Sequence, residues 1–408
     1  MSLHLYKSSA KVKGTIHLSA SKSESNRLLL MSALADTPFD LQNVSDAKDT
    51  QTMQRLLSQK NSIWDVMEAG TTMRFCTAYL ALKGQDHIIT GTERMKQRPI
   101  GVLVEALKAL GADIEYLEAV GYPPMKINGL KQQRANQLSI PGNISSQFIS
   151  ALLMIAPSLP QGLQLTLTEE IFSKPYIEMT LSLMSEFGVD HEWVDRTISI
   201  APQQYKSKAH AVESDWSGAS YWYVMAAVAE EAQFTLKGLK QSSLQGDRQI
   251  VKIMEPFGVI TEFGDNQLTI RKSQEFSNEI DIDFKTCPDL AQGVMVAAAL
   301  KGIKLRMTGL ETLKIKETDR ISAMRNELRK IGTELSENAA GNEWELLPGG
   351  GSFKPPIIET YEDHRMAMAF GPLALRSDLI VEEPDVIKKS YPGYWEDLRN
   401  IGIEMSSN

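Results

Sequence analysis

The chain has 408 residues, of which 42% are hydrophobic and 23% charged, so it can bury more core than one ordinary domain holds. No stretch reaches the roughly 18 to 20 apolar residues of a membrane-spanning helix, and the first seven residues lack the apolar core of a signal peptide. The formal net charge of −8 argues against nucleic-acid or membrane partners, because both attract positive surfaces.

The cytoplasm is therefore the expected location. Cys76 and Cys287 are the only cysteines, and neither has a nearby Cys or paired His. No disulfide framework and no metal site is predicted, and both cysteines are expected to be small core residues.

An internal repeat runs along the chain. Six strongly apolar segments each follow a short polar segment, and each is typical of a helix buried on nearly all sides. They cover residues 26–35, 73–82, 146–156, 219–229, 291–300 and 364–375. Their polar marker residues are spaced by 47 residues at the first step and by 72 or 73 afterwards, so the first repeat is shortened.

A second series of helices runs in phase with the first. These helices are amphipathic, and a glycine suited to a left-handed C-cap ends each of them before an alternating segment that predicts a strand. The glycines are Gly111, Gly188, Gly258, Gly332 and Gly402. Each repeat of about 70 residues therefore contains one buried helix, one half-exposed helix and strands between them.

The repeats predict an α/β fold of two similar domains, each built from three repeated α/β units with buried parallel helices. We expect one domain at 20–212 and the other at 1–19 with 213–408, where residues 1–19 add a strand to the second domain. If the buried helices are parallel, their N-termini converge and favour anions, because a helix N-terminus carries free N–H groups and partial positive charge.

The polar segments contain the candidate site residues. Lys22, Ser23 and Arg27 offer two cations and a hydroxyl to a phosphate or carboxylate. Gly70 lets a ligand approach the backbone closely, and Arg98 precedes a helix that starts at a proline. Ordinary caps and surface arginines are the competing interpretations.

The third repeat contributes neutral groups of the kind that bind sugar or cyclitol hydroxyls. They are Ser145, Ser146, Gln147, Ser173 and Tyr176.

The second half of the chain carries the acid–base candidates. Lys316, Glu317 and Arg320 combine an acid, a base that tunes it and an anion anchor within one helical turn. Four further candidates stand at the starts of predicted helices: Asp289, His364, Arg365 and Lys389. An N-cap, an exposed salt-bridged face and a structural histidine are the alternatives.

The motifs SKSESNR, AGTTMR, RMKQRPIG, GNISSQF, FSKPYIEM, PDLAQ, IKETDR, EDHRMAMAF and KSYPGYW occur in the order and phase typical of one family. Over nearly its whole length the chain resembles the 5-enolpyruvylshikimate-3-phosphate synthases. The resemblance implies the inside-out α/β barrel of enolpyruvyl transferases, with two domains that close on an active site in the cleft between them. It implies a monomer with no cofactor and no metal, inhibited by glyphosate.

The resemblance also implies roles for the candidate residues. Shikimate 3-phosphate would be held by Lys22, Ser23, Arg27, Ser145, Ser146, Gln147, Ser173, Tyr176, Asp289 and Lys316. Phosphoenolpyruvate would be held by Lys22, Gly70, Arg98, Gln147, Arg320, Arg365 and Lys389. The implied catalytic residues are Lys22, Asp289, Glu317 and His364.

In the implied reaction, the 5-hydroxyl of the acceptor loses a proton as it attacks C2 of the enol while C3 gains one, and the tetrahedral ketal then expels phosphate. The chain departs from the common family pattern at Glu68, Phe75 and Thr312. One alternative is the related transferase that acts on UDP-N-acetylglucosamine, which typically has Lys-Asn where this chain has Lys22-Ser23. A non-catalytic repeat scaffold is the alternative from another class.

Overall fold

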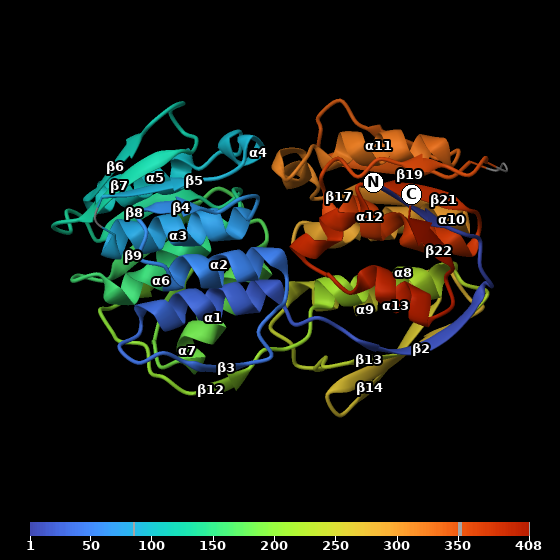
Figure 1. Ribbon diagram of the computed structural model, residues 1–408, viewed down its shortest axis with the longest axis horizontal. Coiled ribbons are helices and arrows are strands. Elements are labelled where there is room, and N and C mark those ends of the chain that lie inside the picture. Colours follow the sequence, from blue (N-terminus) through green and yellow to red (C-terminus); the bar gives the residue numbers. More distant parts are fainter. Residues whose placement is uncertain (85, 350–352, 408) are drawn as a thin grey trace. The chain divides into compact units, whose positions relative to one another are not determined.

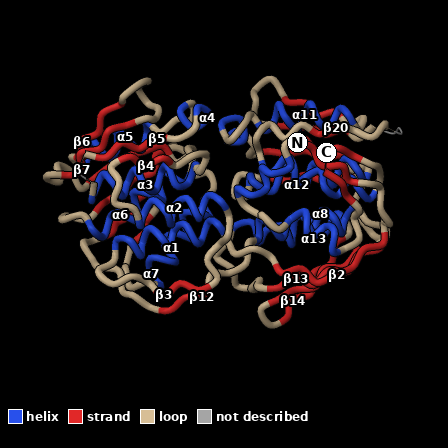
Figure 2. The backbone as a smooth tube through the Cα atoms, in the orientation of Figure 1, coloured by secondary structure: helices blue, strands red, loops and turns tan. Residues whose placement is uncertain are grey.

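The computed structural model describes residues 1–84, 86–349 and 353–407. The chain divides into two compact units, which we call the central unit (Lys22–Val212) and the terminal unit (Met1–Ser21 with Glu213–Asn408). Within each unit the helices lie inside and the strands lie around them (Figures 1 and 2).

The central unit contains the first three repeats. Its helices are α1 (Lys22–Leu34), α2 (Lys48–Ser58), α3 (Gly70–Lys83), α4 (Glu93–Lys96), α5 (Gly101–Leu110), α6 (Ser146–Ile155) and α7 (Lys174–Glu186), with the 3₁₀ helix η1 (Ala156–Ser158). Its strands are β3 (Asp40–Gln42), β4 (Ile63–Asp65), β5 (His87–Thr90), β6 (Ala112–Tyr116), β7 (Met125–Leu130), β8 (Gln137–Pro141), β9 (Leu163–Thr168), β10 (Glu192–Val194), β11 (Thr197–Ile200) and β12 (Ala209–Ala211).

The terminal unit contains the other three repeats. Its helices are α8 (Trp216–Val228), α9 (Ile250–Met254), α10 (Ala291–Lys301), α11 (Arg320–Lys330), α12 (His364–Phe370) and α13 (Tyr394–Asn400). Its strands are β1 (Ser2–Leu5), β2 (Lys11–His17), β13 (Glu231–Lys237), β14 (Val259–Gly264), β15 (Gln267–Lys272), β16 (Glu279–Asp283), β17 (Lys304–Thr308), β18 (Glu334–Glu337), β19 (Glu343–Leu347), β20 (Ile357–Ile358), β21 (Leu379–Glu382) and β22 (Met405–Ser407). Its 3₁₀ helices are η2 (Gly246–Gln249), η3 (Glu255–Phe257), η4 (Pro288–Leu290), η5 (Glu311–Ile315), η6 (Gly371–Leu375) and η7 (Pro384–Lys389).

One sheet pattern recurs through the described residues. Two parallel strands flank a buried helix, and two antiparallel strands complete the sheet. The pattern forms the sheets β4-β5-β7-β6, β8-β9-β11-β10, β2-β13-β15-β14, β16-β17-β19-β18 and β20-β21-β1-β22. The first repeat keeps only the parallel pair β12 and β3, which accounts for its shorter length. The predicted fold class is confirmed.

The chain's first residues pair with strands from much later in the sequence. β2 lies parallel to β13, with Lys11 opposite Glu231, and β1 lies antiparallel to β21, with Ser2 opposite Glu382. Both strands belong to the terminal unit, so the central unit is inserted between β2 and α8.

The six predicted buried helices are α1, α3, α6, α8, α10 and α12. The first three pack against one another in the central unit, and the last three do so in the terminal unit. The last apolar segment is not one α-helix. Its α-helical part ends at Phe370 and continues as the 3₁₀ helix η6, because Pro372 has no N–H for an α-helical hydrogen bond.

All five predicted cap glycines have the expected left-handed backbone. Gly111 has φ of 110° after α5, and Gly402 has φ of 98° after α13. The other three, Gly188, Gly258 and Gly332, also have positive φ. These caps turn each amphipathic helix back toward its sheet. No helix in the described part of the chain combines the length and the apolar character needed to cross a membrane.

Candidate functional site

In the terminal unit, the starts of several helices meet at Asp289. This residue lies in η4, directly before α10, and its Oδ1 accepts a hydrogen bond from Arg320 Nη1 at 3.0 Å. Its Oδ2 accepts from Arg365 Nη2, also at 3.0 Å. Arg320 begins α11 and Arg365 is the second residue of α12, while Nη2 of Arg365 also contacts Ser217 Oγ at the start of α8 (3.4 Å). The N-termini of these helices therefore converge, as their predicted parallel packing requires.

Arg320 is the most buried basic side chain of this cluster, with 2% of its surface exposed. Its Nε donates to Asp363 Oδ2 at 2.6 Å, and its Nη2 donates to Glu317 Oε2 at 2.8 Å. Asp363 also caps α12 by accepting from the backbone N–H of Arg365 at 2.8 Å. Burial by itself lowers the pKa of Arg320, but the surrounding carboxylates outweigh that effect and raise it, so this guanidinium is always charged.

The charges around Arg320 also set the pKa of Asp289. Burial by itself raises the pKa of this carboxyl group. The positive charges of Arg365, Lys316 and Arg320 outweigh burial and hold the pKa of Asp289 well below its usual range. Lys316 Nζ lies 3.8 Å from Asp289 Oδ1, and burial lowers the pKa of this amine. Asp289 is thus ionised and a weak base as long as no anionic ligand is bound to these cations.

The remaining predicted residues of this unit border the cluster. Lys389 Nζ, at the end of η7, donates to the carbonyl of Glu362 at 2.7 Å. The His364 ring is buried, and its Nδ1 lies 3.7 Å from Asp363 Oδ1. All seven residues predicted for this half of the chain therefore lie together or beside Asp363. They are Asp289, Lys316, Glu317, Arg320, His364, Arg365 and Lys389.

In the central unit a second set of helix starts meets around Lys22. Lys22 begins α1, and its Nζ lies 3.3 Å from Oδ2 of Asp49, in the first turn of α2. The backbone carbonyl of Asp49 accepts from Thr72 Oγ1, in the first turn of α3, at 3.1 Å. Asp49 thus ties three helix starts together.

Gly70 and Arg98 are adjacent in the structure. A Cβ atom on Gly70, the first residue of α3, would lie 2.6 Å from Nη1 of Arg98. The absence of a side chain at this position is therefore what lets the Arg98 guanidinium lie over the start of α3. Gln147 lies beside the same helix start, since its Nε2 donates to Thr71 Oγ1 at 3.0 Å.

The neutral residues of the third repeat lie at two helix starts. Ser145 caps α6 by accepting from the N–H of Gln147, and Ser146 is the first residue of that helix. Ser173 precedes α7 with a left-handed φ of 54°, an uncommon conformation for a residue with a side chain, and Tyr176 follows in the first turn. The carbonyl of Tyr176 accepts a hydrogen bond from Arg27 Nη2 at 3.3 Å.

Two side chains that join these clusters were not identified from the sequence. They are Asp49, which contacts Lys22, and Asp363, which contacts Arg320. Each is a first-turn or capping residue, a position at which an aspartate is common. Asp363 directly precedes His364 and Arg365, so its capping role was predictable from that signal. Its ion pair with Arg320 joins residues 43 positions apart, and no local pattern indicates it.

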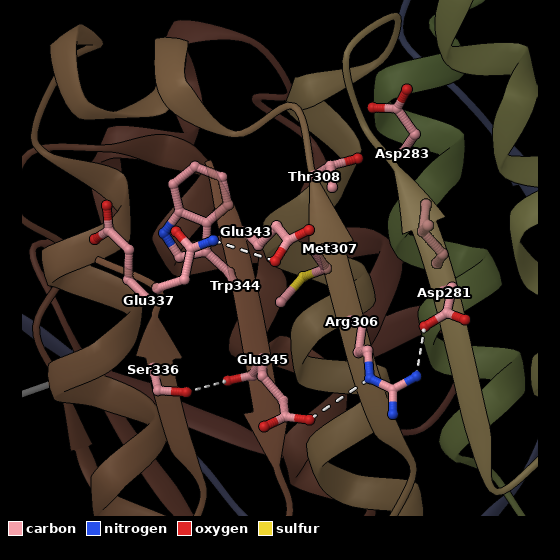
Figure 3. A pocket seen from close by; sticks show the side chains of 12 residues that line it. Asp281, Asp283, Arg306, Met307, Thr308, Ser336, Glu337, Glu343, Trp344 and Glu345 are labelled. Atoms are coloured by element: carbon pink, nitrogen blue, oxygen red, sulfur yellow. Dashed lines mark hydrogen bonds and ion pairs between the residues drawn. The ribbon is translucent and has the colours of Figure 1, made fainter. Parts of the chain in front are cut away.

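The described surface also has grooves away from these clusters. One of about 680 Å³ lies on the sheet β16-β17-β19-β18, where Arg306 pairs with Asp281 and Glu345 at 3.6 and 3.7 Å (Figure 3). A second of about 610 Å³ lies by β9 and β11. Neither is lined by a predicted site residue. Within the residues that the structure covers, no three His, Cys, Asp or Glu side chains are grouped as a metal site.

Comparisons with known proteins find relatives along nearly the whole chain. The family model described as "EPSP synthase (3-phosphoshikimate 1-carboxyvinyltransferase)" matches residues 6–60 and 54–398. The chain is 47% identical over 405 residues to a 3-phosphoshikimate 1-carboxyvinyltransferase of Bacteroides fragilis, covering 98% of each chain. It is 35% identical over 421 residues to the enzyme of the same name from Pectobacterium atrosepticum, covering 96% of each. A solved EPSP synthase from Acinetobacter baumannii has the same fold, with a TM-score of 0.79 at 22% identity over the full length of both chains.

Proposed function

The chain belongs to the EPSP synthase (3-phosphoshikimate 1-carboxyvinyltransferase) family, and we infer that it transfers the enolpyruvyl group of phosphoenolpyruvate to shikimate 3-phosphate. It is an enzyme of the shikimate pathway. The observation that carries the inference is the 47% identity to a 3-phosphoshikimate 1-carboxyvinyltransferase over 98% of both chains. A non-catalytic binding scaffold would need no such agreement, and a UDP-N-acetylglucosamine transferase would act on a different acceptor.

We propose that the phosphate and carboxylate of phosphoenolpyruvate bind to the basic groups at the helix starts. In the terminal unit these are Arg320, Arg365 and Lys389, and in the central unit Lys22 and Arg98, with Gly70 and Gln147 beside them. The helix N-termini add partial positive charge to each group. Arginine suits this role because its planar fork matches a carboxylate or phosphate and stays charged when buried.

We propose that shikimate 3-phosphate is bound by residues supplied by both units. The central unit supplies Lys22, Ser23, Arg27, Ser145, Ser146, Gln147, Ser173 and Tyr176, and the terminal unit supplies Asp289 and Lys316. The serine, glutamine and tyrosine groups suit ring hydroxyls and phosphate oxygens, because they both donate and accept hydrogen bonds.

The low pKa of Asp289 gives this site a substrate-dependent base. When an anionic substrate binds to Arg320 and Arg365, it neutralises part of the charge that holds this pKa down. The pKa of Asp289 then rises, and the carboxylate becomes able to accept the proton of the 5-hydroxyl as that oxygen attacks C2 of the enol. Asp289 thus becomes a base only when phosphoenolpyruvate is bound.

Glu317 is the proposed donor of the other proton. It is partly exposed and is held by Arg320 Nη2 at 2.8 Å, three residues further along the chain. We propose that Glu317 acts in its protonated form and gives that proton to C3 as the C–O bond forms. This yields the tetrahedral ketal phosphate and leaves Glu317 as a carboxylate, which the ion pair with Arg320 stabilises. Loss of phosphate and return of the C3 proton then yield the vinyl ether. Lys22 and His364 are the other proposed catalytic residues, which stabilise charge on the phosphate and carboxylate groups during these steps.

We also propose that the protein works as a cytoplasmic monomer whose two units are its two domains. Light scattering of the purified protein tests the monomer directly. The function is tested by incubating the protein with both substrates and following inorganic phosphate together with the mass of the acceptor product. Phosphate release that needs both substrates, with one enolpyruvyl group added per phosphate, is expected. Phosphate release without acceptor, or none at all, would contradict the proposed function.

A further inference from the structure

Arg27 is a buried cation whose hydrogen-bond partners are all neutral. Only 2% of its surface is exposed. Its Nε donates to Thr180 Oγ1 at 2.7 Å, and its Nη1 donates to the carbonyl of Ser23 at 2.9 Å. Its Nη2 donates to Ser150 Oγ at 3.2 Å and to the carbonyl of Tyr176 at 3.3 Å. No carboxylate in the described part of the chain forms an ion pair with it.

Such a site has a charge without a counter-ion. Burying an unpaired guanidinium costs free energy, and burial lowers the pKa of Arg27 to about 10, so the group still carries its charge at neutral pH. Glu24 is the carboxylate that acts on it electrostatically, yet Glu24 Oε1 is bound to His210 Nε2 at 2.8 Å. Arg27 therefore has no direct ion pair within the described chain, and a bound anionic ligand would supply one.

Two hydroxyls fix the direction of the guanidinium. Thr180 and Ser150 are fully buried, on α7 and α6. The Thr180 hydroxyl donates to the carbonyl of Tyr176 at 2.8 Å, so its lone pairs remain for Arg27 Nε. Since that proton is committed, Ser150 is the donor in the 2.9 Å hydrogen bond between the two hydroxyls. Each hydroxyl thus presents lone pairs to Arg27, and together they hold the Nε and Nη2 edge of the planar group.

Phe75 lies against the guanidinium from a third helix. Its ring centroid is 5.6 Å from Arg27 Cζ, and the side chain is fully buried in α3. This contact lies within the range of a cation–π interaction. Phe75 departs from the common family residue at this position, and the structure places that departure at Arg27.

We propose that Thr180 and Ser150 are positioning residues for the acceptor substrate, which orient Arg27 so that an anionic group of shikimate 3-phosphate supplies its counter-charge. The proposal deepens the proposed function and rests on it. The guanidinium has five N–H groups, and four of them donate to the neutral oxygens described above. The fifth is the second N–H of Nη1, beside Ser23, and it remains for a ligand. Ser23 is itself one of the residues proposed to bind the acceptor.

The test removes each hydroxyl and measures the two substrates separately. Thr180→Val keeps the side-chain shape and loses the acceptor of Arg27 Nε. Because hydrogen bonds to charged groups are strong, we expect KM for shikimate 3-phosphate to rise about tenfold, with kcat and KM for phosphoenolpyruvate within about twofold of the unmodified protein. Ser150→Ala should raise the same KM by about three- to fivefold. Thr180→Ser, which keeps the hydroxyl, should restore the original KM.

The control is Thr166→Val, which removes a part-buried threonine hydroxyl in the same unit, where it contacts Thr197 Oγ1 at 3.0 Å. It should leave both KM values unchanged. Thr180→Val is then repeated in an Arg27→Met protein, where a residue acting through Arg27 has nothing left to position, so no further rise in KM is expected.

The outcomes are distinct. An equal rise in KM with and without Arg27, or a fall in kcat with KM unchanged, overturns the positioning role. If Thr180→Val does not fold, Ser150→Ala and Thr180→Ser decide the matter by the same measurements. Failure of the unmodified protein to use shikimate 3-phosphate would instead contradict the proposed function, which the first assay reveals before any variant is made.

Discussion

The space left by Gly70 provides a sharp test of the proposed phosphoenolpyruvate site. In Gly70→Ala the new Cβ would lie 2.6 Å from Nη1, 2.8 Å from Nη2 and 2.9 Å from Cζ of Arg98. An ordinary contact is about 3.5 Å, so the guanidinium must move by about 1 Å. Arg98 is a long, flexible side chain that can yield, and alanine is a better helix former than glycine, so the fold should not suffer.

Gly70→Ala should therefore impair the binding of phosphoenolpyruvate rather than the stability of the fold. A displacement of this size in a substrate-positioning group lowers the rate by about 10²-fold, and we expect that loss in kcat/KM for phosphoenolpyruvate. KM for shikimate 3-phosphate should stay within about twofold, because Arg98 is not among its proposed contacts. Initial rates of phosphate release at varied phosphoenolpyruvate, together with thermal unfolding, measure both effects.

A matched variant separates crowding from a general effect of the substitution. In Gly393→Ala the nearest atom to the new Cβ is Asp397 Oδ2 at 3.8 Å, an ordinary contact, so kinetics should not change. If Gly70→Ala keeps the original kcat/KM for phosphoenolpyruvate, the Arg98 guanidinium does not bind this substrate, and its assignment to the site is wrong.

Three further predictions concern catalysis, charge and stability. Glu317→Gln should lower kcat by about 10² to 10⁴-fold with both KM values nearly unchanged, because Arg320 keeps its other carboxylate partners; an unmodified rate would remove Glu317 from catalysis. Turnover should persist in excess chelator, since arginine and lysine side chains neutralise the substrates; activity lost in chelator and restored by a metal ion would contradict this. The hydrogen bonds that His210 makes with Glu24 and Glu186 raise the pKa of His210 despite burial. The protonated imidazole therefore stabilises the fold fully below about pH 6.5, and this stabilisation is lost as the pH rises through the pKa of the folded state. His210→Gln should therefore lower the free energy of unfolding more at pH 6 than at pH 9 in urea titrations, and a pH-independent loss would refute this.

The helices of the fold could be predicted because their signals are local. Apolar runs mark α3 and α8 by their composition alone, and a glycine such as Gly111 marks the end of an amphipathic helix because few other residues adopt its backbone. The partners of the strands could not be predicted in the same way. β2 pairs with β13 across more than 200 residues, and alternation along a strand does not identify its neighbour.

The site residues also divide into those with a local sequence signal and those without one. The sequence identified Lys316, Glu317 and Arg320 because they are close neighbours in the chain. The prediction of a shared helical turn was wrong, because Lys316 is extended and Asp319 caps α11, which begins only at Arg320. The structure nevertheless brings the three residues to Asp289 as one cluster. It did not identify Thr180 as a partner of Arg27, because a threonine in the middle of a helix gives no pattern distinct from any other. A hydrogen-bond partner such as Thr180 can be recognised only from the contact that the structure shows.

The choice of acceptor tests the account most directly. The purified protein is given phosphoenolpyruvate with either shikimate 3-phosphate or UDP-N-acetylglucosamine, and kcat/KM is measured for each acceptor from phosphate release. We expect rapid turnover with shikimate 3-phosphate and none above background with the nucleotide sugar, because Ser23 and the neutral groups around Ser145 suit the phosphorylated cyclitol. Turnover with the nucleotide sugar, or with neither acceptor, would contradict the assignment of this site to shikimate 3-phosphate.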